Sequence, residues 1–245
     1  MSAESHRIRE IPYNYTSFSD HEIVLRFLGE EAWGLINQLR TSRQTGRSAR
    51  MLFEVLGDLW VISRNPFIQD DMLQNPKRNA ALIGAMRHRI EQIQRRSDDN
   101  QQAIALAGKA TKAIDEFSQG LESQRQLRKQ LKAKLSGATR RCNVDFSGQA
   151  RVAHVTDATD WRVEFPLAVI SPDNEQEVEA IVAACIKLGL TVIPRGGGTG
   201  YTGGAVPLYA DSVVINTEKL IHVASVKTQQ LPGTDSEYAT IAVEA

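Results

Sequence analysis

The residues of this chain best suited to chemistry lie in a glycine-rich run, IPRGGGTGYTGGAVP, from Ile193 to Pro207. Six of the nine residues from 196 to 204 are glycine. Glycine adopts left-handed backbone conformations at little cost, and successive amides in mixed right- and left-handed conformations form a concave nest for anions. The run therefore predicts a backbone that comes close to an anionic group such as a phosphate.

Two familiar phosphate motifs do not fit this run. A P-loop needs a lysine that reaches the terminal phosphates, and the run contains none. The dinucleotide fingerprint G-x-G-x-x-G is matched by Gly198, Gly200 and Gly203, but it must open a helix that carries the diphosphate at its N-terminus. Only a short stretch containing Pro207 precedes the next apolar segment, so a full crossover helix does not fit.

A long loop at the carboxyl end of a parallel strand is the interpretation that remains. Its own amides would wrap a diphosphate, and Arg195 with the hydroxyls of Thr199 and Thr202 would add further donors. The alternative is a merely flexible loop. Flexible linkers are typically rich in serine, whereas this run has no serine and is framed by an apolar segment, an arginine and prolines.

A βαβ unit must position this loop. Apolar, β-branched segments predict three strands, at residues 165–170, 190–193 and 213–216. The spacing of apolar residues predicts a helix over 174–188, capped by Ser171 or Asp173 and ended by Gly189 in a left-handed conformation. Because the connections between strand and helix are short, the flanking strands should be parallel.

The sequence from residue 18 to about residue 135 has a different, mostly helical pattern. Its first segment predicts an amphipathic helix or a short helix pair, capped by Ser19 or Asp20 and broken around Gly29 or Gly34. A short strand is predicted at 59–63, and long helices at 77–96 and 101–135. Two Asn-Pro steps lie between the strand and the first long helix, and the residue before each proline should be extended.

The helix predicted at 101–135 carries both leucines and basic residues. The leucines expected in an apolar stripe are Leu121, Leu127, Leu131 and Leu135. The basic residues expected on the other sides are Arg125, Arg128, Lys129, Lys132 and Lys134. We do not expect a nucleic-acid surface here, because no aromatic residues lie between the basic ones to stack on bases.

Composition limits the class of protein. The 245 residues contain 29 Lys plus Arg and 29 Asp plus Glu, so no overall field attracts nucleic acid or an anionic membrane. Cys142 and Cys185 lie far apart and outside any metal-binding spacing, as expected for free thiols in a reducing compartment. No segment reads as a signal peptide or transmembrane helix, so we expect a cytoplasmic protein that could associate peripherally with the inner membrane.

Several other polar and aromatic residues have both a ligand-binding and a structural interpretation. His154 could approach a ligand, but a surface or packing role is the alternative, and His222 is expected in a loop. Four residues could position a ligand or simply form a turn with their own backbone: Asp157, Thr159, Asp160 and Arg162. Trp33 and Trp161 are expected in the core or an interface rather than against a cofactor.

The segment FPLAVISPDNEQEVEAIVAACIKLGLTVIPRGGGTGYTGGAVP resembles the start of the FAD-binding domain of the vanillyl-alcohol oxidase and p-cresol methylhydroxylase superfamily. Upstream, VTDATDWRVEFPLAVISP is similar to a segment of FAD-linked D-lactate dehydrogenases and glycolate oxidase-like proteins. The N-terminal REIPYNYTSFSDHEIV and the helical region after it resemble the front module of large bacterial FAD/FMN-containing dehydrogenases. The resemblance implies an α+β chain, with a mostly helical module at 1–145 and the first α/β half of a p-cresol methylhydroxylase-type FAD-binding domain, truncated, at 146–245.

The resemblance also implies which residues meet the cofactor. The amides expected to line the FAD diphosphate belong to Gly196, Gly197, Gly198, Thr199 and Gly200. The residues expected at the start and end of the loop are Pro194, Arg195, Gly203, Gly204 and Ala205. Relatives with covalent flavin have histidine in the place of Thr199, so FAD is expected to be held non-covalently. No catalytic or metal-binding residue is expected within this chain.

The activity that the resemblance implies is oxidation of a 2-hydroxy acid, such as D-lactate or glycolate, by hydride transfer to flavin. Electrons would pass on to a quinone or another carrier. The alternative is a helical interaction or regulatory module fused to a flavin-fold remnant without catalysis. Because the sequence stops within an apparent strand, ATIAVEA, we expect an N-terminal piece of a longer protein, with the substrate cap and any iron–sulfur cluster in the remainder.

Overall fold

The computed structural model describes residues 19–41, 46–97 and 99–244, which divide into two compact units. The described residues up to 129, together with residues 147–149, form a helical unit, whereas residues 130–146 and 150–244 form a second unit that contains the strands. This agrees with the predicted α+β organisation. The domain boundary near residue 145 stays a prediction.

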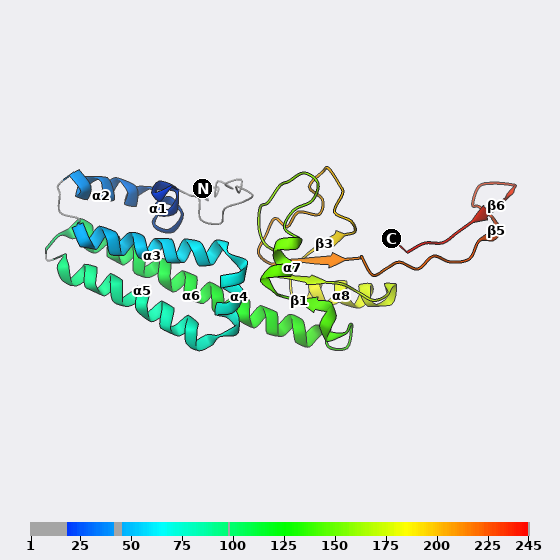
Figure 1. The fold of residues 1–245 in the computed structure, drawn as a ribbon, viewed down its shortest axis with the longest axis horizontal. Helices are drawn as coiled ribbons and strands as arrows, with labels where there is room; N and C mark the ends of the chain where they lie inside the picture. The colour runs from blue at the N-terminus through cyan, green and yellow to red at the C-terminus, as the bar shows by residue number, and fades with distance from the viewer. Residues whose placement is uncertain (1–18, 42–45, 98, 245) are drawn as a thin grey trace. The chain divides into compact units, whose positions relative to one another are not determined.

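Among the residues that the structure describes, six helices precede the first strand (Figure 1). They are α1 (Asp20–Leu28), α2 (Glu30–Thr41), α3 (Gly46–Arg64), α4 (Pro66–Gln74), α5 (Pro76–Arg96) and α6 (Gln101–Leu135). Their apolar faces bury one continuous core, in which Val24, Leu56, Met86 and Ile114 come from four different helices. None of the helices that the structure describes combines the length and apolarity needed to cross a membrane.

Local capping explains where these helices begin and end. The Ser19 hydroxyl accepts a hydrogen bond from the Glu22 amide at the start of α1, which confirms one of the two predicted caps. Gly29, with a φ of 84°, separates α1 from α2, whereas Gly34 lies inside α2. Asn65 and Asn75 precede prolines in non-helical conformations, and their side chains cap α4 and α5.

The strand predicted at 59–63 is wrong, because these residues lie inside α3. The β-branched and aromatic run there suggested a strand. In the longer window, however, Leu52, Val55, Leu56 and Leu59 recur at helical spacing and are all buried. Burial of this face against α5 and the other helices outweighs the weak local preference for strand.

The basic residues of α6 were predicted on the sides of the helix away from the leucine stripe. Not all of them are exposed to solvent in the structure. Arg128 is buried and its Nη1 lies 2.5 Å from Asp70 Oδ1 in α4, and the Arg125 side chain donates to the Leu73 carbonyl oxygen. Both residues therefore fasten α6 to α4. Of the predicted leucine stripe, Leu121, Leu131 and Leu135 are buried, whereas Leu127 is half-buried.

The second unit is built on a four-stranded sheet. Its strands are β1 (Val144–Asp145), β2 (Ala168–Ile170), β3 (Thr191–Arg195) and β4 (Ser212–Asn216), in the order β1-β2-β4-β3. A short 3-10 helix, η1 (Arg141–Asn143), precedes β1, and α7 (Gly148–Ala153) follows it. β2 and β3 each pair in parallel with β4, as the predicted βαβ unit requires, although β4 lies between them.

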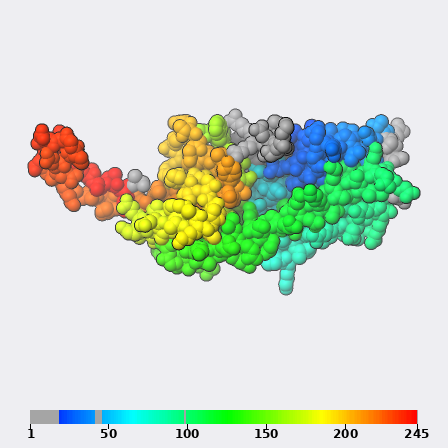
Figure 2. Space-filling view, turned by 180° about the vertical axis from the view of Figure 1, so that it is seen from behind, coloured from blue at the N-terminus to red at the C-terminus, as the bar shows by residue number. Residues whose placement is uncertain are grey.

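Helix α8 (Glu175–Lys187) connects β2 to β3 and lies at the surface of the second unit, where it is yellow in Figure 2. Ile181 and Cys185 are buried on its inner face, and Gly189 ends it with a φ of 67°, as predicted. The cap was predicted wrongly, because Asn174 rather than Ser171 or Asp173 accepts a hydrogen bond from the Glu177 amide.

The first predicted strand is shorter in the structure, since β2 starts only at Ala168. Pro166 has no amide hydrogen, and its carbonyl oxygen accepts a hydrogen bond from the buried Arg151 side chain instead of a strand partner. The chain continues into an antiparallel hairpin of β5 (Lys227–Gln230) and β6 (Glu237–Thr240), whose residues are almost all exposed.

Candidate functional site

The glycine run starts at the carboxyl edge of the parallel strands. β3 ends at Arg195 and the neighbouring β4 ends at Asn216, the register partner of Arg195. Ligands of open α/β sheets bind beyond the carboxyl ends of their strands. A pocket of about 480 Å³ lies at this edge, and among the residues that line it are His154, Arg195, Gly196, Gly197, Asn216 and Thr217. The topology therefore brings the glycine run and the end of β4 together around one cavity.

The backbone of the run has the mixed conformations that an anion nest needs. Gly198 and Gly203 are left-handed, with φ of 66° and 74°, and the other glycines of the run are not. After the run the Val206 amide donates to the Gly203 carbonyl oxygen in a turn, and β4 follows without a helix. The geometry excludes the dinucleotide-fingerprint interpretation, because that motif requires a helix directly after the glycines.

The side chain of Arg195 packs against the glycine run that it precedes. Its Nη1 donates to the Thr156 carbonyl oxygen at 2.6 Å, and its guanidinium lies against Gly198. A Cβ placed on Gly198 would come within 2.3 Å of the guanidinium. The Ala158 amide in turn donates to the Gly198 carbonyl oxygen at 3.0 Å. The positive charge of Arg195 is thus fixed beside the glycine amides, where it adds to their attraction for an anion.

The segment from 156 to 162 forms a turn against the run. The buried Asp157 carboxylate accepts from the Thr159 amide at 2.9 Å and from its hydroxyl at 2.5 Å. Burial alone would raise the pKa of Asp157, but the hydrogen bonds from Thr159 and the Ala205 amide, with the charge of Arg195, outweigh it and lower the pKa. The carboxylate therefore stays ionised and holds the end of the run through Ala205.

Two neighbours of Asp157 complete this turn. Asp160 has a φ of 59°, the left-handed conformation that aspartate tolerates better than most side chains. Its Oδ1 lies 3.6 Å from Arg162 Nη2. Trp161 is 49% exposed and packs on Gly203, where a Cβ would lie 3.4 Å from the indole. Of the two places predicted for Trp161, the core or an interface, its exposure excludes the core. Trp33, in the helical unit, lies at a tilt against His21, with ring centroids 4.8 Å apart and an interplanar angle of 50°.

His154 lies at the pocket and is held in one tautomer. Its Nδ1 lies 2.8 Å from the Ala150 carbonyl oxygen, which can only accept, so Nδ1 carries the hydrogen. Its Nε2 lies 3.1 Å from Asn216 Nδ2 and therefore accepts from that amide. The Asn216 Oδ1 accepts from the Glu218 amide at 3.2 Å, which fixes the same orientation of the Asn216 side chain. His222, by contrast, lies in a loop as predicted, where its amide donates to Glu244.

An ion network fixes the chain after β2 and β4. The Asp173 carboxylate accepts hydrogen bonds from Arg140 at 2.5 and 2.6 Å and from Asn143 at 2.8 Å, and it lies 3.3 Å from Lys219 Nζ. The hydrogen bonds from Arg140 and then Asn143 hold the pKa of Asp173 far below its usual range, against a smaller opposing effect of burial. Because Lys219 also donates to Asn143 Oδ1, the turn after β4 is tied to residues 140–143.

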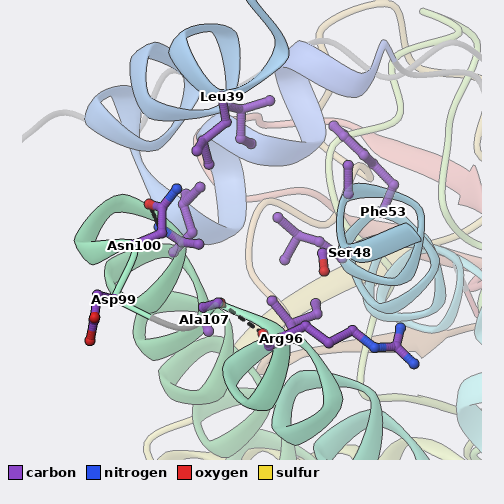
Figure 3. Close-up of a pocket in the computed structure, with 14 residues that line it drawn as sticks. Leu39, Ser48, Phe53, Arg96, Asp99, Asn100 and Ala107 are labelled. Atoms are coloured by element: carbon purple, nitrogen blue, oxygen red, sulfur yellow. Dashed lines mark hydrogen bonds between the residues drawn. The ribbon is translucent and has the colours of Figure 1, made fainter. Parts of the chain in front are cut away.

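The helical unit has a pocket of its own, of about 460 Å³ (Figure 3). Leu39 from α2, Phe53 from α3 and Ala107 from α6 are among the residues that surround it. Its walls are mostly apolar, and it has no glycine-rich loop or strand end to offer backbone amides to a phosphate. It therefore differs in chemistry from the pocket beside the glycine run.

The pocket at the strand ends includes residues that sequence reasoning did not select. Asn216 is the last residue of β4 and Thr217 follows it, and both line the cavity. Part of the signal was available, because 213–216 was predicted as a strand, but its parallel pairing with 190–193 was not predicted. Of the predicted loop residues, Arg195, Gly196 and Gly197 line this pocket, while Gly203 packs on Trp161.

Two known families match separate parts of the chain. Residues 166–245 match the family described as FAD binding domain, and residues 6–119 match a family described as protein of unknown function, DUF3683. The FAD match covers β2 through β6 and includes the whole glycine run. The glycine amides, the left-handed conformations and the fixed charge of Arg195 fit a diphosphate. FAD is therefore the cofactor of this domain.

Three curated proteins are similar to parts of this chain. The glycolate oxidase subunit GlcD of Bacillus subtilis is 34% identical over 73 residues, which are 30% of this chain and 16% of that protein. The mitochondrial D-2-hydroxyglutarate dehydrogenase of Arabidopsis thaliana is 39% identical over 64 residues, 25% of this chain and 11% of that protein. The D-lactate dehydrogenase of Archaeoglobus fulgidus is 44% identical over 52 residues, 21% of this chain and 12% of that protein. The matched segments thus span less than a fifth of each of these proteins.

Proposed function

We propose that this chain, whose residues 166–245 are an FAD-binding domain of the FAD-linked oxidase type, holds the cofactor of an oxidoreductase that acts on a 2-hydroxy acid. The observation that carries the proposal is the glycine run at the carboxyl edge of β3, with its left-handed glycines and the fixed guanidinium of Arg195. The similarity to a glycolate oxidase subunit, a D-lactate dehydrogenase and a D-2-hydroxyglutarate dehydrogenase supports the substrate class.

In this proposal the backbone holds the FAD diphosphate without a covalent bond. The amides of residues 196–200 donate to the phosphate oxygens, and residues 194–195 and 203–205 frame the loop. Bound FAD would accept a hydride from C2 of the hydroxy acid, while the hydroxyl proton leaves to a base and the electrons pass on to a quinone or another carrier. The residues of this chain contribute binding and charge rather than proton transfer, because their task is to anchor the diphosphate.

We also propose the domain boundary near residue 145, with the helical module on its N-terminal side. The segment that matches the DUF3683 family, residues 6–119, lies within this module and makes up most of it. A role of the helical module in binding a partner of this flavoprotein is compatible with the same activity.

Flavin content tests the proposal directly. The purified full-length protein should be yellow and release FAD on denaturation, whereas Gly197→Asp and Gly198→Asp should be colourless because a carboxylate repels the diphosphate. Retention of normal flavin by both variants would contradict the assigned loop. The substrate class is tested by bleaching of the flavin absorbance with D-lactate, glycolate and longer 2-hydroxy acids under anaerobic conditions. A flavin that none of them bleaches would favour a non-catalytic flavin fold.

A further inference from the structure

The pocket at the ends of β3 and β4 contains one hydrogen-bonded chain that the proposed loop does not use. It runs from the Ala150 carbonyl oxygen through His154 to Asn216, with distances of 2.8 Å and 3.1 Å. Asn216 is 4% exposed, lies at the end of β4 and lines the pocket. Its amide nitrogen has two hydrogens, of which His154 accepts one. The other hydrogen is available to a ligand that enters the pocket.

We propose that His154 is a positioning residue for the bound FAD, because its neutral ring orients Asn216 so that the second amide hydrogen donates to an oxygen of the cofactor. The inference rests on the proposed function, since it names a further contact in the same FAD site. It adds a side-chain donor from β4 to the backbone amides that follow β3. Both strands of the parallel pair then hold the cofactor at their carboxyl ends.

The arrangement requires the uncharged ring. Nδ1 of His154 already donates to Ala150, so Nε2 is the position where an added proton would sit. A hydrogen on Nε2 would face the Asn216 amide hydrogen and break that bond. Asn216 cannot simply turn over, because its Oδ1 accepts from the Glu218 amide and a turned side chain would place two donors together there.

Charged groups at the pocket come from both strand ends. Arg195, at the end of β3, and Glu218, after β4, line the pocket together with His154. In α7, which ends directly before His154, Arg151 is buried and donates to the Pro166 carbonyl oxygen.

A glutamine at position 154 provides a matched control. Its side-chain oxygen can accept from Asn216 as Nε2 does, whereas leucine at the same position offers no acceptor. The measurement is the FAD dissociation constant of the reconstituted full-length protein, for the wild type and for each variant. Circular dichroism shows whether the fold of each variant is intact.

His154→Gln should bind FAD nearly as tightly as the wild type. His154→Leu and Asn216→Ala should each weaken binding about tenfold, the usual effect of one lost hydrogen bond. The double variant should be no weaker than either, because both break one unit. If His154→Leu does not fold, the comparison of His154→Gln with Asn216→Ala decides.

Two results would overturn this inference while the proposed function stands. One is FAD binding by folded His154→Gln that is weakened as much as in His154→Leu. The other is unchanged affinity in folded His154→Leu. If the wild type binds no FAD, the proposed function fails, and the inference fails with it.

Discussion

The guanidinium of Arg195 occupies the space in which a side chain on Gly198 would begin. A Cβ there would lie 2.3 Å from one guanidinium nitrogen, and Gly198 has a φ of 66°. Two independent causes therefore require glycine at this position: the left-handed backbone and the guanidinium that lies against it. The same contact keeps the charge of Arg195 next to the backbone amides on either side of Gly198.

This relationship predicts that Gly198→Ala disrupts cofactor binding more than other alanine substitutions in the run. The left-handed conformation costs a non-glycine residue about 1–2 kcal/mol, and the methyl group must also displace Arg195. We expect FAD affinity to fall at least about tenfold, measured by titration of the apoprotein. Gly200→Ala is the matched control, because Gly200 has no left-handed φ and no atom within 4 Å of its Cβ position. Equal losses in the two variants would contradict the role of the Arg195 contact.

The buried ion pair of the helical unit predicts a large stability loss when one partner is removed. Burial lowers the pKa of Arg128, and the hydrogen bond from Arg128 to Asp70 opposes this shift. Arg128→Met would leave the Asp70 carboxylate buried with only the Gln74 amide still bonded to it, at a cost of about 3–5 kcal/mol. The check is urea unfolding of the protein followed by tryptophan fluorescence.

Removing both charges provides the control for this experiment. Arg128→Met combined with Asp70→Leu should recover most of the loss, because no uncompensated charge stays buried. A single variant as stable as the wild type would show that the pair is not buried in solution.

Asp173 predicts that the second unit loses stability in acid. Its pKa is lower in the folded protein than in the unfolded chain, so the folded state binds fewer protons. Its contribution is complete above the ordinary aspartate pKa of about 3.9 and is lost as the pH falls toward the folded value. The melting temperature of Asp173→Asn should therefore lie below that of the wild type at about pH 7, with a difference that shrinks below about pH 4. A difference in melting temperature that stays the same from about pH 7 to below about pH 4 would argue against the ion network of Asp173 with Arg140 and Lys219.

The sequence predicted the parts of this fold that local patterns determine. The βαβ unit, the long helices, the turn at Gly189 and the loop with its glycines follow from periodicity and from residues with special backbone freedom. The predictions failed where distant residues decide. The run at 59–63 is helical because other helices bury it. Arg128 is buried in an ion pair with Asp70, which lies 58 residues away in sequence. His154 and Asn216 form a hydrogen bond although 62 residues separate them, and no local pattern contains such a pair.

The two cysteines should differ sharply in reactivity. Cys142 is exposed, whereas Cys185 is buried on the inner face of α8, where burial raises its thiol pKa to about 11. Because the thiolate is the reactive form, Cys185 should resist alkylation at about pH 8 for two reasons, its lack of access and its small thiolate fraction. Iodoacetamide should therefore label only Cys142 in the native protein, and both thiols after unfolding, as measured by peptide mass spectrometry. Cys142→Ser is the control and should abolish native labelling. Labelling of Cys185 at the same rate as Cys142 would mean that α8 does not stay packed on the sheet.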